Sequence, residues 1–127
     1  MAINILVVDD SAVMRSMLIR TLRMSGIPLG EIHEAGNGTE AVELLTSNHV
    51  DLALVDINMP VMNGDRLIDV MQSDARLAGV QTIVVSTEGS QARVAALTAR
   101  GVRFIHKPFS PEQIRSTVLQ VLGVADA

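Results

Sequence analysis

The sequence predicts an α/β fold, a (βα)5 domain with a doubly wound, five-stranded parallel sheet. Apolar runs rich in β-branched residues recur five times, and amphipathic stretches with helical spacing separate them. Aromatic residues make up only 2% of the chain, so the core must be aliphatic, which suits helices packed on a buried sheet. At 127 residues and 48% hydrophobic, the chain is the size of one domain. We therefore expect a single domain over 1–127, with a core over 3–122 and a short tail over 123–127.

The first βα unit occupies the N-terminal 25 residues. The run INILVV over 3–8 predicts a strand that ends at two aspartates. Helical spacing follows over 12–25, and its apolar positions, between arginines, predict a helix with one buried face: Val13, Met17, Leu18 and Leu22. We interpret most of the methionines in the chain as packing residues.

The second unit begins after a clear stop signal. Gly26 and Pro28 end the first helix. The segment EIHEA over 31–35 reads as a short second strand, and helical spacing resumes from Thr39.

The third and fourth units are separated by a polar loop. DLALV over 51–55 predicts the third strand, and the Asn, Pro and Gly content of 57–64 predicts a loop. A third helix is marked by apolar residues at helical spacing: Leu67, Ile68 and Met71. TIVVS over 82–86 predicts the fourth strand, and a fourth helix should run from near Ser90 to Gly101.

The last unit has the sharpest helix start. VRFI over 102–105 predicts the fifth strand. In the following SPEQ, Ser110 can cap a helix, Pro111 suits its first position, and Gln113 occupies the capping-box position.

Polar side chains follow four of the predicted strands, at the sheet edge where such folds bind ligands. They are Asp9 and Asp10 after the first strand, Asp56 after the third, Ser86 at the end of the fourth, and Lys107 after the fifth. Three neighbouring carboxylates would repel one another, so a bound cation is the simplest resolution. Oxygen-only donors favour a hard ion, and Mg²⁺ fits best. Lys107 is the only lysine in the chain, and its compact ammonium can enter a narrow acidic crevice.

Composition argues against several classes of partner. The net charge of −4 disfavours direct nucleic-acid binding and anionic membrane surfaces. The absence of cysteine rules out disulfides and thiolate metal sites. Without a signal-like or spanning segment, we expect a cytoplasmic protein with no membrane insertion. Taken one at a time, the polar residues could each be turn or cap residues, and only their conjunction favours a site.

Four motifs, VVDDS, DINMPVMNG, VSTEGS and KPFSPEQ, in this order and spacing, resemble the receiver domains of bacterial two-component response regulators of the CheY-like, chemotaxis type. The resemblance covers Ile3 to Leu122. It implies a flavodoxin-like fold. It also implies a signalling switch rather than an enzyme, one that catalyses its own phosphorylation and slow autodephosphorylation.

The resemblance implies roles for the acidic residues and for two of their neighbours. Asp56 would accept the phosphoryl group. Asp10 would bind Mg²⁺ directly, Asp9 would hold it through water, and the backbone carbonyl of Asn58 would be a further ligand. Lys107 would help to neutralise the phosphoryl oxygens.

A second set of roles concerns switching. Ser86 would be the switch hydroxyl and Phe104 the switch aromatic, and the bond before Pro108 would be cis. Asn58 and Glu88 would tune the rate of dephosphorylation.

The resemblance also implies partners. A histidine kinase would donate the phosphoryl group, and a downstream protein such as a flagellar motor switch protein would read the face made by the fourth helix, fifth strand and fifth helix. A phosphatase can assist, and we expect a monomer. Four arginines on or near that face suit an acidic partner or are simply solvated: Arg93, Arg100, Arg103 and Arg115.

Three alternatives stay open at this point. The chain could be the receiver portion of a longer regulator, or a phosphorelay intermediate. A more remote alternative is a phosphatase with an aspartyl nucleophile. Such enzymes need an Asp-x-Asp pair after the first strand, where this chain has DDSA over 9–12.

Overall fold

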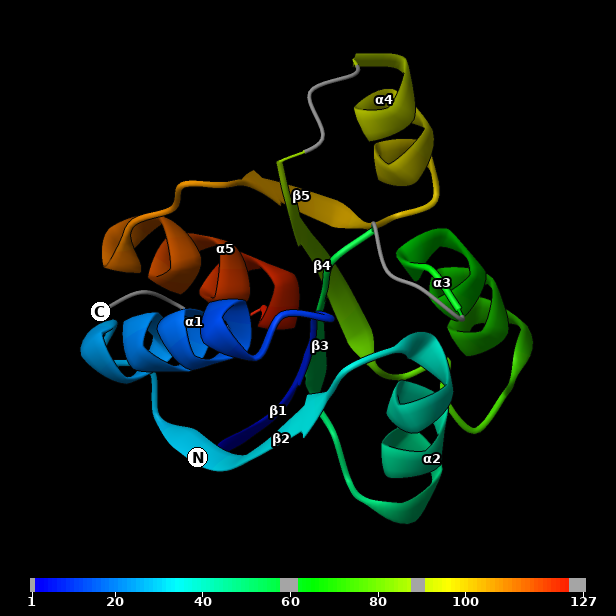
Figure 1. Cartoon of the computed structure of the whole chain (residues 1–127), viewed down its shortest axis with the longest axis horizontal. Coiled ribbons are helices and arrows are strands. Elements are labelled where there is room, and N and C mark those ends of the chain that lie inside the picture. The colour runs from blue at the N-terminus through cyan, green and yellow to red at the C-terminus, as the bar shows by residue number, and fades with distance from the viewer. Residues whose placement is uncertain (1, 58–61, 88–90, 124–127) are drawn as a thin grey trace.

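A computed structural model of the chain describes residues 2–57, 62–87 and 91–123. Within these residues, five parallel strands in the order β2-β1-β3-β4-β5 alternate with five helices (Figure 1). The strands are β1 (Ile3–Val8), β2 (Leu29–Ala35), β3 (Leu52–Val55), β4 (Gln81–Ser86) and β5 (Arg103–His106). The helices are α1 (Ala12–Met24), α2 (Gly38–Ser47), α3 (Gly64–Ser73), α4 (Gln91–Ala99) and α5 (Pro111–Leu122). The predicted doubly wound sheet is confirmed, with its order reversing between β1 and β3.

The element boundaries lie close to those predicted. Strand β2 begins earlier than predicted, at Leu29, because that residue pairs with Ile3 of β1. Helix α5 begins as its sequence predicts: Ser110 caps it by accepting a hydrogen bond from the backbone N–H of Gln113 at 3.1 Å, and Pro111 is its first residue.

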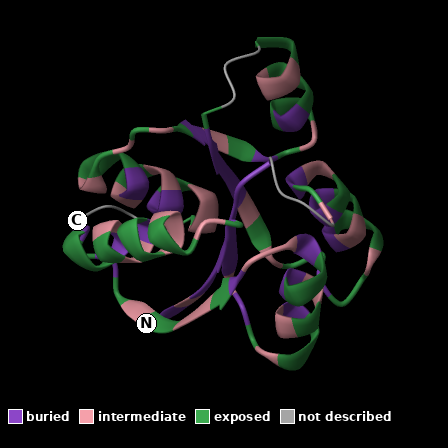
Figure 2. Ribbon diagram, in the orientation of Figure 1, coloured by how far each residue is buried: buried purple, intermediate pink, exposed green. Residues whose placement is uncertain are grey.

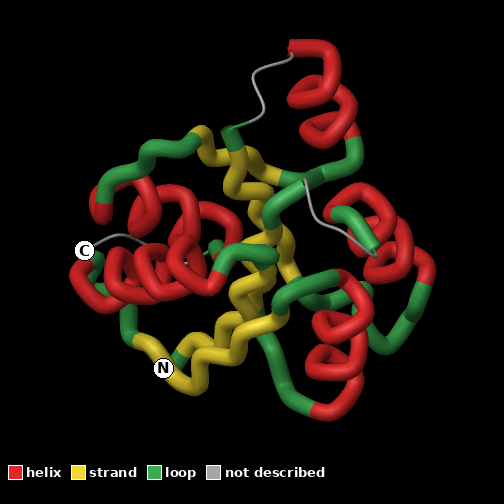
Figure 3. The backbone as a smooth tube through the Cα atoms, viewed as in Figure 1, coloured by secondary structure: helices red, strands yellow, loops and turns green. Residues whose placement is uncertain are grey.

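The helices form two layers, one on each face of the sheet. Helices α1 and α5 cover one face, and α2, α3 and α4 cover the other (Figures 1 and 3). Alternate residues of β1 pack into separate cores, Ile5 and Val7 on the α1 side and Leu6 on the α2 side. Figure 2 shows burial concentrated on the central strands. A strand buried on both faces needs a nearly continuous apolar run, which explains why every residue of 3–8 except Asn4 is apolar.

The buried face of α1 differs from the prediction. Leu18 and Leu22, four residues apart, are buried, but Val13 is 69% exposed and Met17 is 53% exposed. Val13, Met17 and Met24 share another flank of the helix, which no strand or helix in the described part of the chain covers. The prediction that Val13 and Met17 lie on the buried face is wrong, and so is the packing interpretation for the methionines Met17 and Met24.

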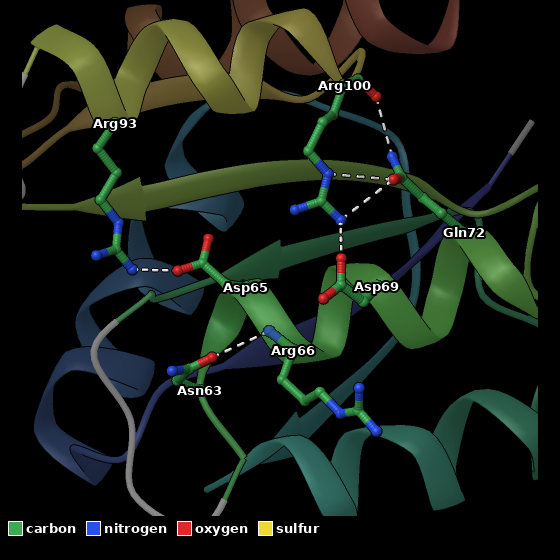
Figure 4. Close-up of polar contacts among 7 residues, drawn as sticks. All are labelled: Asn63, Asp65, Arg66, Asp69, Gln72, Arg93 and Arg100. Atoms are coloured by element: carbon green, nitrogen blue, oxygen red, sulfur yellow. Dashed lines mark hydrogen bonds and ion pairs between the residues drawn. The ribbon is translucent and has the colours of Figure 1, made fainter.

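Helix α4 is anchored more by polar contacts than by burial. Leu97 is the one buried residue of this helix, all of which lies in the described part of the chain. Figure 4 shows Arg93 and Arg100 reaching from the α4 side to acidic residues of α3, where they pair with Asp65 and Asp69 respectively. The two arginines are seven residues apart, two helical turns, so both face α3.

Gln72 completes this α3–α4 ladder. Its side-chain amide donates to the backbone carbonyl of Arg100 at 2.9 Å, just beyond the end of α4. Its amide oxygen accepts from the Arg100 guanidinium at 3.3 Å. The C-terminal end of α4 is therefore bonded to α3 through both the backbone carbonyl and the side chain of Arg100.

No helix in the described part of the chain is long and apolar enough to cross a membrane.

Candidate functional site

Backbone hydrogen bonds place three predicted residues at one edge of the sheet. Asp9 N–H donates to the carbonyl of Ala35 at 3.1 Å, and Asp56 N–H donates to that of Val8 at 2.9 Å. Lys107 N–H donates to the carbonyl of Ser86 at 3.0 Å. Each bond extends a parallel ladder by one step beyond a strand. The strand order therefore brings together residues that are nearly a hundred positions apart in the sequence.

The acidic side chains converge at this edge. One carboxylate oxygen from each of Asp9, Asp10 and Asp56 lies within 4.8 Å of the others. Asp9 is 5% exposed and Asp56 9% exposed, whereas Asp10 is open to solvent. The Lys107 ammonium lies 3.0 Å from Oδ2 of Asp9. Three carboxylates against one ammonium leave an excess of two negative charges, and these hard oxygen donors fit a divalent ion such as Mg²⁺.

Asp9 is held in place by local structure as well. Its Oδ1 accepts a hydrogen bond from Ser11 N–H at 2.9 Å. Ser11 is the N-cap of α1, and its hydroxyl accepts from Met14 N–H at 3.2 Å. The Lys107–Pro108 peptide bond is cis, and the Lys107 side chain is 15% exposed. The ion pair between Lys107 and Asp9 joins two residues whose backbone N–H groups are both hydrogen-bonded to neighbouring segments.

The predicted switch residues lie on neighbouring strands. Ser86 is fully buried at the end of β4, opposite His106 of β5. Phe104 lies opposite Val84, two residues before His106, and its ring centroid is 4.6 Å from that of His106. The Phe104 side chain is half-buried against the cluster that contains Leu97 of α4. A movement of the Phe104 side chain would therefore change its packing against α4.

Two predicted residues fall outside the described residues. Asn58, expected as a metal ligand through its carbonyl, lies in 58–61, and Glu88 lies in 88–90. Their roles stay predictions.

Two residues beside the site, Arg15 and Glu34, are not predicted from the sequence. The Arg15 Nη1 donates to the backbone carbonyl of Asp9 at 2.5 Å, and its Nε donates to Oε1 of Glu34 at 3.0 Å. Arg15 is one of several arginines on an amphipathic helix, where such residues are usually solvated, and nothing in the local sequence distinguishes it from the others. Only the packing of α1 beside the ends of β1 and β2 brings it to the site.

Most of the four arginines considered for binding an acidic partner already have partners within the domain. Arg93 and Arg100 are engaged with α3, and the Arg115 guanidinium donates to the carbonyl of Ser25 at 3.1 Å. Arg103 is exposed on β5. Three of the four arginines are therefore used inside the domain, because acidic or carbonyl acceptors lie within their reach.

Comparison with known proteins gives concordant matches. The family model described as the response regulator receiver domain matches residues 5–119. The chemotaxis protein CheY1 of Helicobacter pylori is 38% identical over 125 residues, 97% of this chain and 99% of that protein. The chemotaxis protein CheY homolog of Campylobacter jejuni is 38% identical over 122 residues, 94% and 92% of the two chains. The solved structure of Vibrio cholerae chemotaxis protein CheY4 superposes with a TM-score of 0.83 at 29% identity, covering 96% of this chain and 100% of that one.

Proposed function

Because this chain belongs to the response regulator receiver domain family, we propose that it is a phosphorylation-switched signalling domain that accepts a phosphoryl group onto Asp56. The observation that carries this proposal is the convergence of the carboxylates of Asp9, Asp10 and Asp56, with Lys107 bonded to Asp9. Relatives named as chemotaxis proteins support a role in chemotaxis or motility control. The whole of 1–127 then acts as a single receiver domain in the cytoplasm.

The acidic cluster would hold Mg²⁺. Asp10 and Asp56 would be its direct protein ligands, Asp9 would act through water, and the carbonyl of Asn58 would add a further ligand. The fit rests on the excess negative charge and on the hard oxygen donors at the site. When bound, the ion supplies positive charge that offsets the charge of the phosphoryl oxygens.

Phosphoryl transfer is then a displacement at phosphorus. A carboxylate oxygen of Asp56 attacks the phosphorus of a phosphohistidine on a histidine kinase. The new O–P bond forms as the P–N bond breaks, and the imidazole nitrogen keeps the bonding electron pair. Lys107 exchanges its contact with Asp9 for one with a phosphoryl oxygen. Its single-point ammonium suits this exchange because it needs no planar, bidentate partner.

The surface beside the site suits contact with a protein donor. Val13 and Met17 are exposed on α1. An open, mainly apolar groove of about 450 Å³ includes Lys107 in its wall. Its lining residues are Met14, Met17, Thr21, Thr87, Lys107, Pro108 and Phe109. Exposed apolar surface of this kind is typical of protein contact sites.

The output would be read at the face formed by α4, β5 and α5. Movement of Ser86 toward the phosphoryl group gives Phe104 room to turn inward, and Phe104 packs beside Leu97 of α4. A downstream protein such as a flagellar motor switch protein would bind the altered face of a monomer. Asn58 and Glu88 would set the rate of autodephosphorylation, with or without a phosphatase.

A second reading is the receiver portion of a longer regulator, in which this face would contact an attached domain. The full reading frame separates the two readings, since only the longer regulator continues into an output domain.

Intact mass after incubation with acetyl phosphate tests the chemistry. We expect the wild type to gain the mass of one phosphoryl group with Mg²⁺ and none with a chelator, and Asp56→Asn to gain none. Asp74→Asn, a matched loss of one carboxylate on the surface away from the site, should gain the same mass as the wild type. A wild type that stays unmodified with Mg²⁺ present would refute the proposal.

A further inference from the structure

Arg15 links the acidic cluster to the end of β2. It is the fourth residue of α1, and its side chain is 18% exposed. Two separate nitrogens of its guanidinium contact two acceptors, the carbonyl of Asp9 at 2.5 Å and the carboxylate of Glu34 at 3.0 Å. We propose that Arg15 is a positioning residue for the metal site, which it serves by fixing the peptide between Asp9 and Asp10. The inference rests on the proposed function, because it assumes that the cluster binds Mg²⁺.

The contact with the Asp9 carbonyl matters because a peptide unit is rigid. The carbonyl oxygen of Asp9 and the N and Cα of Asp10 lie in one plane, so holding that oxygen sets the direction in which Asp10 leaves the strand. The backbone N–H and the carboxylate of Asp9 are held on other sides, by Ala35, Ser11 and Lys107. Asp10 is exposed, and no hydrogen bond of its side chain is seen among the described residues. The aim of its carboxylate therefore depends on its backbone, and through it on Arg15.

Glu34 has two effects on this arrangement. Its carboxylate holds the guanidinium at the end of β2, which keeps Nη1 directed at the Asp9 carbonyl. It also offsets a positive charge that would otherwise oppose a divalent cation at the neighbouring cluster. Removing Glu34 should therefore weaken cation binding even though Arg15 remains.

The geometry calls for arginine rather than lysine. A planar guanidinium can donate to two acceptors in fixed directions at once, whereas an ammonium at the end of a flexible chain satisfies them less well. Arg15→Lys keeps the charge and loses the fork. It therefore separates the geometric role of Arg15 from its charge.

Mg²⁺ titrations of the full chain test the inference without relying on phosphorylation. Binding is followed by NMR from the amide signals of Asp10 and Ser11, and folding is checked by urea unfolding of each variant. We expect Arg15→Gln to raise the Mg²⁺ dissociation constant about tenfold, the usual scale for losing a residue that orients a metal ligand. Arg15→Lys and Glu34→Gln should fall between it and the wild type.

The matched control is Arg20→Gln, which removes the same charge from an exposed position of the same helix. We expect it to change the dissociation constant by less than about twofold, because salt screens distant surface charges. Equal weakening by Arg20→Gln and Arg15→Gln would overturn the inference, because the effect would then not depend on the contact between Arg15 and the Asp9 carbonyl; a net-charge effect alone would strengthen cation binding in both variants. If Arg15→Gln does not fold, Glu34→Gln takes its place, and wild-type affinity in that variant would overturn the inference.

The outcomes for Arg15 and for the proposed function can be told apart by adding the phosphorylation assay at saturating Mg²⁺. Wild-type phosphorylation together with unchanged Mg²⁺ affinity in Arg15→Gln would overturn the role of Arg15 and leave the proposed function standing. Weakened Mg²⁺ binding in Arg15→Gln, with no phosphorylation even of the wild type, would overturn the proposed function and leave the role of Arg15 standing. A wild type that binds no Mg²⁺ would overturn both.

Discussion

Gly64, next to the acidic cluster, has no room for a side chain. It is the first residue of α3, and its N–H donates to the carbonyl of Ile57 at 2.9 Å. A Cβ atom at this position would lie 2.6 Å from the carbonyl oxygen of Asp56 and 2.7 Å from Cα of Ile57. Ordinary van der Waals contact begins at 3.4 Å, so Gly64→Ala forces either α3 or the end of β3 to move by most of an ångström.

The cost of this movement follows from what surrounds it. Both close atoms belong to the backbone, Ile57 is fully buried, and Asp56 N–H is bonded to Val8, so no flexible side chain can absorb the shift. Overpacking of this kind costs about 1–3 kcal/mol. With the upper half of that range and a urea m-value of about 1–3 kcal/mol/M, the midpoint of unfolding should fall by about 0.7–3 M. Displacement of the Asp56 carboxylate should also slow its phosphorylation by about tenfold or more.

Urea unfolding and the rate of Asp56 phosphorylation by acetyl phosphate, measured on the same preparations, check both effects. Gly79→Ala is the matched control because nothing lies within 4 Å of a Cβ at that position. Its stability should stay within about 0.5 kcal/mol of the wild type, with an unchanged phosphorylation rate. If Gly64→Ala behaved like Gly79→Ala in both assays, the reasoning from backbone contact would be refuted.

Two further predictions concern charged side chains at the surface. Arg93→Gln and Arg100→Gln should each lower the protection of α4 amides from hydrogen exchange by up to about 1 kcal/mol at low salt, with less effect at high salt. Arg66→Gln is the control, since that side chain points away from α4 in Figure 4, and an equal loss there would contradict the role of the α3–α4 ladder. Hydrogen bonds from the Arg76 guanidinium hold the pKa of Asp74 below its ordinary value, so the stability from this pair is complete above about pH 4 and is lost as the pH falls through the lowered pKa. NMR titration of the Asp74 carboxyl should show a higher pKa in Arg76→Gln than in the wild type, and an unchanged pKa would contradict this cause.

Much of the fold and the core of the candidate site could be predicted because they depend on local patterns. A run such as INILVV, apolar at every position except Asn4, indicates a strand covered on both faces, and SPEQ contains the cap and first residue of a helix. In a parallel sheet all strands end at the same edge. Once the strands were placed, Asp9, Asp56 and Lys107 had to lie at that edge whatever the details of packing.

The remaining features depend on contacts between segments distant in the sequence, so no local pattern contains them. Helical spacing in α1 does not decide which flank meets the sheet, and packing left Val13 and Met17 in solvent. Arg15 contacts Asp9 and Glu34, which lie at the ends of two different strands. Those of Arg93 and Arg100 lie on α3, close to 30 positions earlier. Periodicity and capping are local, so the amino-acid order was enough to predict the helices and strands, their succession along the chain and the polar residues at the strand ends. Tertiary structure alone decided which charged side chains meet, because that depends on how the helices rotate and pack against the sheet and against one another.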